Sequence, residues 1–129
     1  MTTRKKALVT GGGTGIGRSA VLALAAAGFD VAINYASSAK AAQAVADEAQ
    51  ALGAQALLLQ CDVSDDAAVR QMLAKVGEAF GHLDALINNA GTTATWKVKD
   101  LESLDMDAWD RTFAVNVRGN FQVSRAAVA

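Results

Sequence analysis

A cluster of glycines follows the first apolar run of the chain, in the stretch ALVTGGGTGIG that ends at Gly17. Thr10, Gly11, Gly15 and Gly17 satisfy the spacing T-G-x-x-x-G-x-G. Glycine at such positions lets the backbone turn sharply out of a strand and brings N–H groups close to a pyrophosphate at a helix N-terminus, where a Cβ would collide. The stretch therefore predicts a phosphate-binding turn.

Other interpretations of the same glycines compete with this one. No register of residues 11–17 supplies the pattern G-x-G-x-x-G. The P-loop pattern G-x-x-x-x-G-K-S/T would run from Gly12 to Ser19, but Arg18 stands where that loop needs lysine. Asp84, the acid to be considered for magnesium, falls near the amino end of its predicted strand. A glycine-rich turn without any ligand stays open at this point.

Four further residues of chemically active types have simpler explanations. Cys61, at a strand end, is expected to be an inert buried thiol rather than a nucleophile. His82 falls in the turn before the fourth strand, at the wrong edge of a parallel sheet for chemistry. Trp109 and Phe113 are four residues apart, which favours packing in the core over contact with a cofactor.

Alternating apolar and helical segments must position the glycine turn. Short, largely apolar runs typical of strands buried on both faces occupy residues 7–10, 31–35, 56–60 and 83–88. Helix formers with apolar residues at three- and four-residue steps occupy residues 16–27, 39–52 and 65–80, and a fourth helix is expected from Asp107 onward. This alternation predicts an α/β fold with right-handed crossovers and ligands at the carboxyl ends of parallel strands.

Residues at the predicted helix ends agree with this assignment. Ser64 is expected to be the N-cap of the third helix, and Gly28, Gly53 and Gly81 each fall just beyond the end of a helix. No linker rich in proline or serine divides the chain, so residues 1–129 are predicted to form a single domain.

Composition limits the function classes. The 129 residues are 52% hydrophobic and 19% charged, which is typical of a globular domain, and the net charge of -1 gives no reason to expect nucleic acid or a membrane as partner. The single cysteine and the lack of any Cys/His cluster with metal-ligand spacing favour a reducing compartment, the cytoplasm, and no metal. The apolar run after Arg4 is too short for a targeting or spanning segment.

Four sequence blocks resemble the short-chain dehydrogenase/reductase family. TGGGTGIG, CDVSD, NNAG and WDRTFAVNVRG occur in the family's order, and the resemblance covers the chain from Lys5 onward. It implies a Rossmann-type doubly wound parallel sheet, of which this chain holds the first four strands, truncated before the fifth. It also implies an oxidoreductase that transfers hydride between NADP(H) and a carbonyl or alcohol substrate, and within the family the sequence resembles members that are like 3-oxoacyl-(acyl-carrier-protein) reductases.

The resemblance implies roles for individual residues. The pyrophosphate would lie on Gly11, Gly15 and Gly17, with Ile16 beside the nicotinamide half and Thr14 in the same turn. Asp62 would bind the adenine amino group with Val63 against the ring, and Asn89, Ala90 and Gly91 would line the ribose. Asn116 matches a family position in a distorted helix that orients a water in a proton relay. The side chain of Asn88 is expected to pair backbone groups between strands, with Thr10 as its neighbour.

The end of the second strand bears on the choice of cofactor. A family member that uses NAD would place an acidic residue there to bind the ribose hydroxyls, whereas Asp30 lies at the opposite end of the strand. Tyr35 stands at the end of the strand instead and is expected to be a further cofactor-binding residue. The candidates to accept a 2′-phosphate are neutral or basic, namely Asn34, Ser37, Ser38 and Lys40. NADP(H) is therefore the predicted cofactor and NAD(H) the alternative, although Thr14 stands where many NADP-dependent members carry Arg or Lys.

The family's remaining catalytic groups, a Ser and a Tyr-x-x-x-Lys pair, are absent from these residues. Tyr35 is the only tyrosine, and Ala39 stands four residues later. A polypeptide ending at Ala129 is therefore expected to be inactive, because nothing is placed to donate the proton. Two alternatives stay open, a non-enzymatic dinucleotide-binding module complete at this length and a structural fragment that pairs with another chain.

The resemblance also implies a class of substrate and an oligomeric state for the full-length protein. Residues 92–99 are expected to wall the reactive end of the pocket, and the substrate is expected to be a 3-oxoacyl, sugar or similar carbonyl compound. The full-length protein is expected to be a homotetramer. Its long helix would supply one interface through apolar residues beyond the stripe that faces the core, namely Phe113, Val117, Phe121 and Val128.

Overall fold

The computed structural model describes residues 3–93 and 99–129 of the chain. Within these residues, four strands form a parallel sheet in the order β3-β2-β1-β4. The strands are β1 (Lys5–Val9), β2 (Phe29–Tyr35), β3 (Ala56–Gln60) and β4 (Ala85–Ile87). The predicted α/β class and the four parallel strands are confirmed, and β4 lies at an edge of the sheet.

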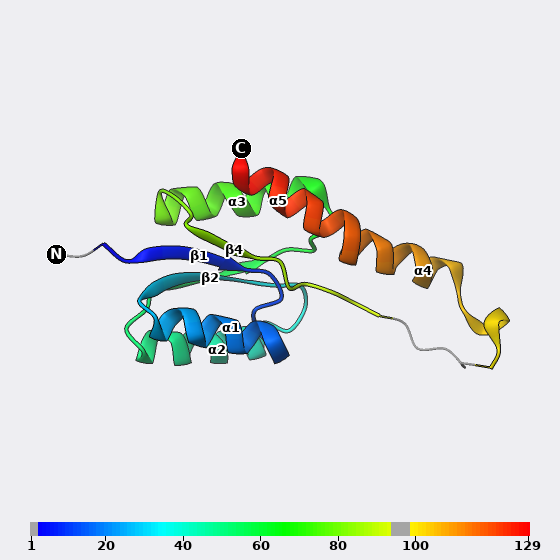
Figure 1. Cartoon of the computed structure of the whole chain (residues 1–129), viewed down its shortest axis with the longest axis horizontal. Helices are drawn as coiled ribbons and strands as arrows, with labels where there is room; N and C mark the ends of the chain where they lie inside the picture. The colour runs from blue at the N-terminus through cyan, green and yellow to red at the C-terminus, as the bar shows by residue number, and fades with distance from the viewer. Residues whose placement is uncertain (1–2, 94–98) are drawn as a thin grey trace.

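Helices cover both faces of the sheet (Figure 1). On one face lie α1 (Gly15–Ala26) and α2 (Ala39–Ala51), and on the other lie α3 (Asp66–Phe80) and the long helix. The long helix consists of three continuous parts, α4 (Met106–Phe113), the π-helical turn η2 (Ala114–Gly119) and α5 (Asn120–Val128). A short 3-10 helix, η1 (Leu101–Ser103), precedes it.

Alternate residues of the central strands supply two cores. Leu8 of β1 packs with side chains of α3 and α5, whereas its neighbour Val9 packs with side chains of α1 and α2. Ala32 and Ile33 of β2 divide in the same way. A strand that is buried on both faces has no polar position in its pattern, and this explains why the strands occur as continuous apolar runs in the sequence.

The structure shifts some predicted boundaries. β1 begins two residues earlier than expected, because Lys5 and Lys6 continue the ladder opposite Phe29 and Asp30. The prediction that Ser64 caps α3 is wrong by one residue, since the Asp65 side chain accepts a hydrogen bond from the Ala68 N–H at 3.2 Å. The three glycines predicted to follow helices are confirmed, with φ of 97° at Gly28, 92° at Gly53 and 81° at Gly81.

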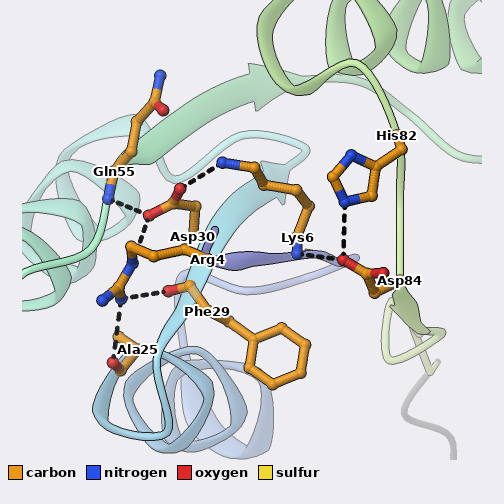
Figure 2. Close-up of polar contacts among 8 residues, drawn as sticks. All are labelled: Arg4, Lys6, Ala25, Phe29, Asp30, Gln55, His82 and Asp84. Carbon is orange, nitrogen blue, oxygen red and sulfur yellow. Dashed lines mark hydrogen bonds and ion pairs between the residues drawn. The ribbon is translucent and has the colours of Figure 1, made fainter. Parts of the chain in front are cut away.

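Charged side chains join the strands at the amino edge of the sheet (Figure 2). Asp30 is almost fully buried and accepts hydrogen bonds from Arg4 Nε at 2.8 Å, Lys6 Nζ at 2.5 Å and the Gln55 N–H at 2.8 Å. Asp30 therefore lies at the amino end of β2 and not at its carboxyl end, as predicted.

The same edge holds the histidine. Asp84 accepts the Lys6 N–H at 2.7 Å and pairs with His82 Nε2 at 3.0 Å, as Figure 2 shows. Both residues therefore lie away from the carboxyl ends of the strands. This confirms the prediction that His82 is at the wrong edge for chemistry and that Asp84 is near the amino end of its strand.

Aromatic residues of α4 correct one prediction. Trp109 and Phe113 stack on each other with ring centroids 5.3 Å apart, but their exposed fractions are 49% and 50%. They do not belong to the core, because α4 extends beyond the end of the sheet, and no described helix or strand packs beneath it there (Figure 1). Their spacing of four residues correctly predicted that both side chains lie on one face of a helix. The prediction that this face is buried in the core was wrong.

Within the described residues, no helix combines the length and apolar character needed to cross a membrane.

Candidate functional site

The glycine turn between β1 and α1 requires glycine at defined atoms. Gly11 and Gly15 adopt positive φ of 62° and 54°. A Cβ at Gly17 would lie 2.0 Å from the Gly11 carbonyl oxygen, and a Cβ at Gly11 would lie 3.1 Å from Ala90 Cα. The first turn of α1 thus packs directly on the loop, which leaves the helix N-terminus facing the carboxyl edge of the sheet. This arrangement fits an anionic phosphate group.

The other predicted residues of this turn are exposed. Thr14 is the N-cap of α1, and its side chain makes no capping hydrogen bond. Ile16 is 80% exposed although it is a large apolar residue. Arg18, which weakens the P-loop interpretation, points to α2, where its Nη2 pairs with Glu48 Oε2 at 2.7 Å.

Asn34 has a different place from the one predicted. Its side chain is buried, its Oδ1 accepts the Gly11 N–H at 3.2 Å, and its Nδ2 donates to the carbonyl oxygens of Leu59 at 3.3 Å and Cys61 at 3.1 Å. Both amide hydrogens are therefore engaged with backbone. Asn34 ties the glycine turn to the end of β3, and its side chain has no free donor for a 2′-phosphate.

Thr10 and Asn89 hold the NNAG segment against the glycine turn. The Thr10 hydroxyl oxygen accepts the N–H groups of Asn89 and Ala90, both at 2.9 Å, and Asn89 Nδ2 donates to the Gly11 carbonyl at 3.1 Å. The prediction for Asn88 is wrong, because its Nδ2 donates to the Ser124 hydroxyl of α5 at 2.9 Å. Asn89 makes the contact to backbone that was expected of Asn88.

Asp62 follows β3 and has both carboxylate oxygens engaged. Its Oδ1 accepts the Ser64 hydroxyl at 2.7 Å and the Ser64 N–H at 3.0 Å, and its Oδ2 pairs with Arg111 Nη2 at 2.9 Å. Burial raises the pKa of Asp62, but the hydrogen bonds from Ser64 and Arg111 outweigh it and lower the pKa below 3.8. Asp62 is therefore an ionised acceptor at neutral pH.

Cys61, the neighbour of Asp62, is buried and chemically quiet. Burial, assisted by the charges of Asp62 and Asp65, raises the pKa of its thiol to about 11. A thiol with such a pKa is almost entirely protonated at neutral pH, so the prediction of an inert cysteine is confirmed.

Asn116 lies in the π-helical turn η2 and contacts the segment that follows NNAG. Its Oδ1 accepts the Thr92 N–H at 2.7 Å, and its Nδ2 donates to the Thr92 carbonyl at 2.8 Å. The Asn116 carbonyl accepts Asn120 Nδ2 at 2.9 Å. The expected distortion of the helix is present at this residue. π-helical turns often occur at functional sites.

These residues meet around a cavity of about 320 Å³ at the carboxyl edge. Seven predicted cofactor residues line it, namely Gly11, Asn34, Ser37, Asp62, Val63, Ala90 and Gly91. The predicted cofactor residues outside its lining are Thr14, Gly15, Ile16, Gly17, Tyr35, Ser38, Lys40 and Asn89. A depression of about 410 Å³ lies at the opposite, amino edge and contains no predicted site residue.

Arg111 and Val115 also line the cavity, and sequence reasoning did not assign them. Both come from the long helix, whose approach to the end of β3 depends on tertiary packing. Their spacing of four residues on a predicted helix was the available signal. In the described part of the chain, no group of three His, Cys, Asp or Glu side chains could hold a metal ion. Of the predicted wall 92–99, residues 94–98 lie outside the described residues.

The fold is that of a Rossmann-type nucleotide-binding domain. A model of the short chain dehydrogenase family matches residues 5–129, and the chain belongs to this family. Versicolorin reductase stcU of Emericella nidulans is 44% identical over 123 residues, which cover 95% of this chain and 46% of that protein. The 3-oxoacyl-(acyl-carrier-protein) reductase FabG of Staphylococcus aureus is 40% identical over 127 residues, with coverage of 98% and 50%. The chain thus spans about half the length of these curated relatives.

Solved structures agree with this assignment. A short chain dehydrogenase from Burkholderia cenocepacia in complex with NADP is 48% identical, has a TM-score of 0.89 and is matched over 96% of this chain and 49% of that one. A short-chain dehydrogenase/reductase from Serratia marcescens is 41% identical, with a TM-score of 0.88 and coverage of 96% and 49%. The family resemblance and the fold are confirmed, and these relatives give no support to a non-enzymatic module.

Proposed function

We propose that the intact protein is an oxidoreductase that transfers hydride between NADP(H) and a carbonyl or alcohol substrate. The observation that carries this proposal is the close contact at Gly17, where any side chain would meet the Gly11 carbonyl and close the turn at the N-terminus of α1. Glycine is required there for an approach of backbone to a phosphate group. The NADP complex of the Burkholderia relative supports the same choice.

The pyrophosphate is assigned to the turn formed by Gly11, Gly15 and Gly17, next to Thr14. Backbone N–H groups and the positive end of the helix dipole attract its negative charge there. Ile16, whose exposed side chain lacks a partner face in the described residues, is assigned to the nicotinamide half. When bound, the dinucleotide supplies or accepts the hydride.

The adenosine half is assigned to the 320 Å³ cavity. Asp62 offers an ionised acceptor to the adenine amino group, and the buried side chain of Val63 gives an apolar surface for the ring. The segment from Asn89 to Gly91 is assigned to the ribose. Its backbone is already held in place by Thr10, so little ordering remains to be done when the cofactor binds.

The preference for NADP(H) rests on the residues that follow β2. Ser37 lines the cavity, and Ser38 and Lys40, which follow it in the sequence, are exposed. Residues 34–40 contain no acidic side chain that would repel a 2′-phosphate. Tyr35 is assigned to this site as well. Asn34 contributes by holding the turn instead of by binding phosphate, because its amide is fully engaged.

Asn116 is assigned to proton transfer in the intact enzyme. Its side chain is held by the backbone of Thr92, so its main chain stays fixed relative to the cavity. Residues 1–129 supply no Tyr-x-x-x-Lys pair, and we propose that a polypeptide limited to them is inactive. The relatives named as 3-oxoacyl-(acyl-carrier-protein) and versicolorin reductases support a carbonyl substrate.

Binding of the two cofactors to the intact protein tests the proposal. We expect the dissociation constant of NADPH to be at least about tenfold below that of NADH, because one charge-assisted phosphate contact contributes about 1.5 kcal/mol or more. Fluorescence titration of each reduced cofactor gives both constants. Tighter binding of NADH than of NADPH would reverse the assignment of the cofactor. A protein that binds neither NADPH nor NADH would contradict the proposed function.

The location and assembly of the protein are proposed as cytoplasmic and homotetrameric. The single cysteine favours a reducing compartment. The exposed apolar residues of the long helix favour assembly, since Phe113, Val117 and Phe121 line a groove of about 700 Å³ and are each at least half exposed.

A further inference from the structure

Arg111 of α4 reaches across to the loop between β3 and α3. Its Nη2 pairs with Asp62 Oδ2 at 2.9 Å, and its Nη1 donates to the Ser64 hydroxyl oxygen at 2.8 Å. That hydroxyl in turn donates its proton to Asp62 Oδ1 at 2.7 Å. The three side chains therefore form a closed ring of hydrogen bonds at the wall of the cavity.

The ring fixes the direction in which the Asp62 carboxylate points. One oxygen is held by Ser64 and the other by Arg111, so the carboxylate cannot rotate without breaking a contact. Each carboxylate oxygen can accept two hydrogen bonds, so Oδ2 keeps a lone pair for a ligand. The cavity wall thus presents an oriented acceptor that suits the exocyclic amino group of a purine.

Arg111 holds the side chain of Asp62, but it is not needed to hold the backbone of the loop between β3 and α3. Other parts of the long helix hold the backbone of this loop, since Gln122 Nε2 donates to the Val63 carbonyl at 2.8 Å. Gly119 also approaches Val63 so closely that a Cβ there would lie 2.7 Å from Val63 Cγ2. Loss of the Arg111 side chain would leave these contacts in place, so its effect should be confined to the carboxylate.

The ion pair also contributes little to stability. The side chains of Arg111 and Asp62 are 50% and 41% exposed, and such pairs are weak because water competes for both charges. The contribution of this ion pair to the free energy of folding is therefore too small to explain why the three side chains form a ring.

We propose that Arg111 is a positioning residue that orients Asp62 and thereby makes the cavity selective for adenine over a purine with an oxygen at position 6. The proposal rests on the proposed function, because it requires the adenosine half in this cavity. A carboxylate that accepts from an amino group would be repelled by a carbonyl oxygen at the same place. Arg111 therefore determines the ratio of the affinities for the two purines.

The test compares NADPH with reduced nicotinamide hypoxanthine dinucleotide phosphate, which carries oxygen in place of the adenine amino group. In the intact wild-type protein we expect NADPH to bind about tenfold or more tightly, as befits one hydrogen bond to a charged acceptor. In Arg111→Met we expect the ratio of dissociation constants to fall to within about twofold of unity, through weaker NADPH binding. The constant of the hypoxanthine cofactor should stay unchanged. Fluorescence titration supplies all four constants.

Arg70→Met is the matched control. Arg70 pairs with Asp66 at 2.9 Å on α3, its side chain is 55% exposed, and it does not line the cavity. This variant should keep the wild-type ratio and a similar melting temperature. Arg111→Lys is a second variant that keeps a charge but not the two-pronged contact, and we expect it to give an intermediate ratio.

The pH dependence of the ratio of dissociation constants is a second measurement, which a purely structural role of Arg111 would not affect. The wild-type preference should be lost as the pH falls through the lowered pKa of Asp62, whereas the ratio for Arg111→Met, already near unity, should not change with pH. A wild-type ratio retained by both Arg111 variants would overturn the proposal. Tighter binding of NADPH by Arg111→Met would overturn it too, because Arg111 would then compete with the base.

Failure of the proposed function gives a separate result. A wild-type protein that binds neither cofactor would refute both proposals. A wild-type protein that binds both equally would refute the role of Arg111 and leave the dinucleotide site standing.

Discussion

Asp30 is a buried carboxylate whose negative charge stabilises the fold. It is 4% exposed and accepts hydrogen bonds from Arg4, Lys6 and the backbone of Gln55, so one carboxylate joins the amino end of β1 to the segment before β3. Removal of the negative charge would leave two cations facing an amide. We expect Asp30→Asn to lower the free energy of unfolding by about 2 kcal/mol at neutral pH.

The pH dependence of this loss follows from the pKa of Asp30. Burial, the largest influence, raises it, but hydrogen bonds from Lys6, Gln55 and Arg4 bring it below the unfolded value of 3.8. A carboxyl whose pKa is lowered by folding contributes stability above its unfolded pKa and loses it as the pH falls through the folded value. The difference between wild type and Asp30→Asn should therefore shrink below pH 3.8.

Urea denaturation of both proteins at neutral pH and near pH 3 measures this difference. Asp47→Asn serves as the control, because Asp47 is an exposed carboxylate on α2. We expect it to change the stability by less than about 0.5 kcal/mol. A loss at Asp30 that is the same at both pH values would contradict the role of its charge.

At the scale of elements, the loop after β1 packs against the first turn of α1 with no room for a side chain at Gly17. A Cβ on Gly17 would lie 2.0 Å from the Gly11 carbonyl, so alanine requires the helix and the loop to separate. We expect Gly17→Ala to lower the free energy of unfolding by about 3 kcal/mol and to weaken NADPH binding. Thermal unfolding and fluorescence titration of the intact protein provide the two measurements.

Gly77→Ala is the natural comparison for this element. Gly77 also lies within a helix, but a Cβ there meets nothing within 4 Å. Alanine has the higher helix propensity, so this variant should be more stable by about 1 kcal/mol and bind NADPH normally. Equal effects of the two substitutions would show that helix propensity, and not the close approach at Gly17, determines the outcome.

At the scale of the whole molecule, the long helix has two unlike faces. One face joins α3 and the loop after β3, and the other exposes Phe113, Val117 and Phe121. If this apolar face is the subunit interface that we propose, a charge at its centre would have to lose its water on assembly. We expect Phe121→Glu to convert the intact tetramer to smaller species.

Light scattering with size exclusion gives the mass of each variant in solution. Leu52→Glu is the control, because Leu52 is 49% exposed at the end of α2, on the opposite side of the sheet. This variant should remain a tetramer. A stable monomer of the wild-type protein would rule out the proposed assembly.

The sequence by itself determined the class of the fold and indicated where the candidate site lies. Strands buried on both faces need continuous apolar residues, and helices need apolar residues at steps of three and four. Left-handed turns need glycine at Gly28, Gly53 and Gly81, and the close contact at Gly17 excludes every larger residue. These are local constraints, which single positions and spacings record. The predicted order of strands and helices was therefore correct.

Tertiary structure alone decided which partner each polar side chain meets. Asn34 binds the glycine turn, Asn88 binds Ser124 and Asn89 makes the contact expected of Asn88. Arg111 joins the cavity from 49 residues beyond Asp62 along the chain, and the aromatic residues of α4 stay exposed because no helix or strand of the described residues covers them. Hydrogen bonds and burial depend on groups that are distant in sequence, and the pattern around one residue does not specify which distant group arrives beside it.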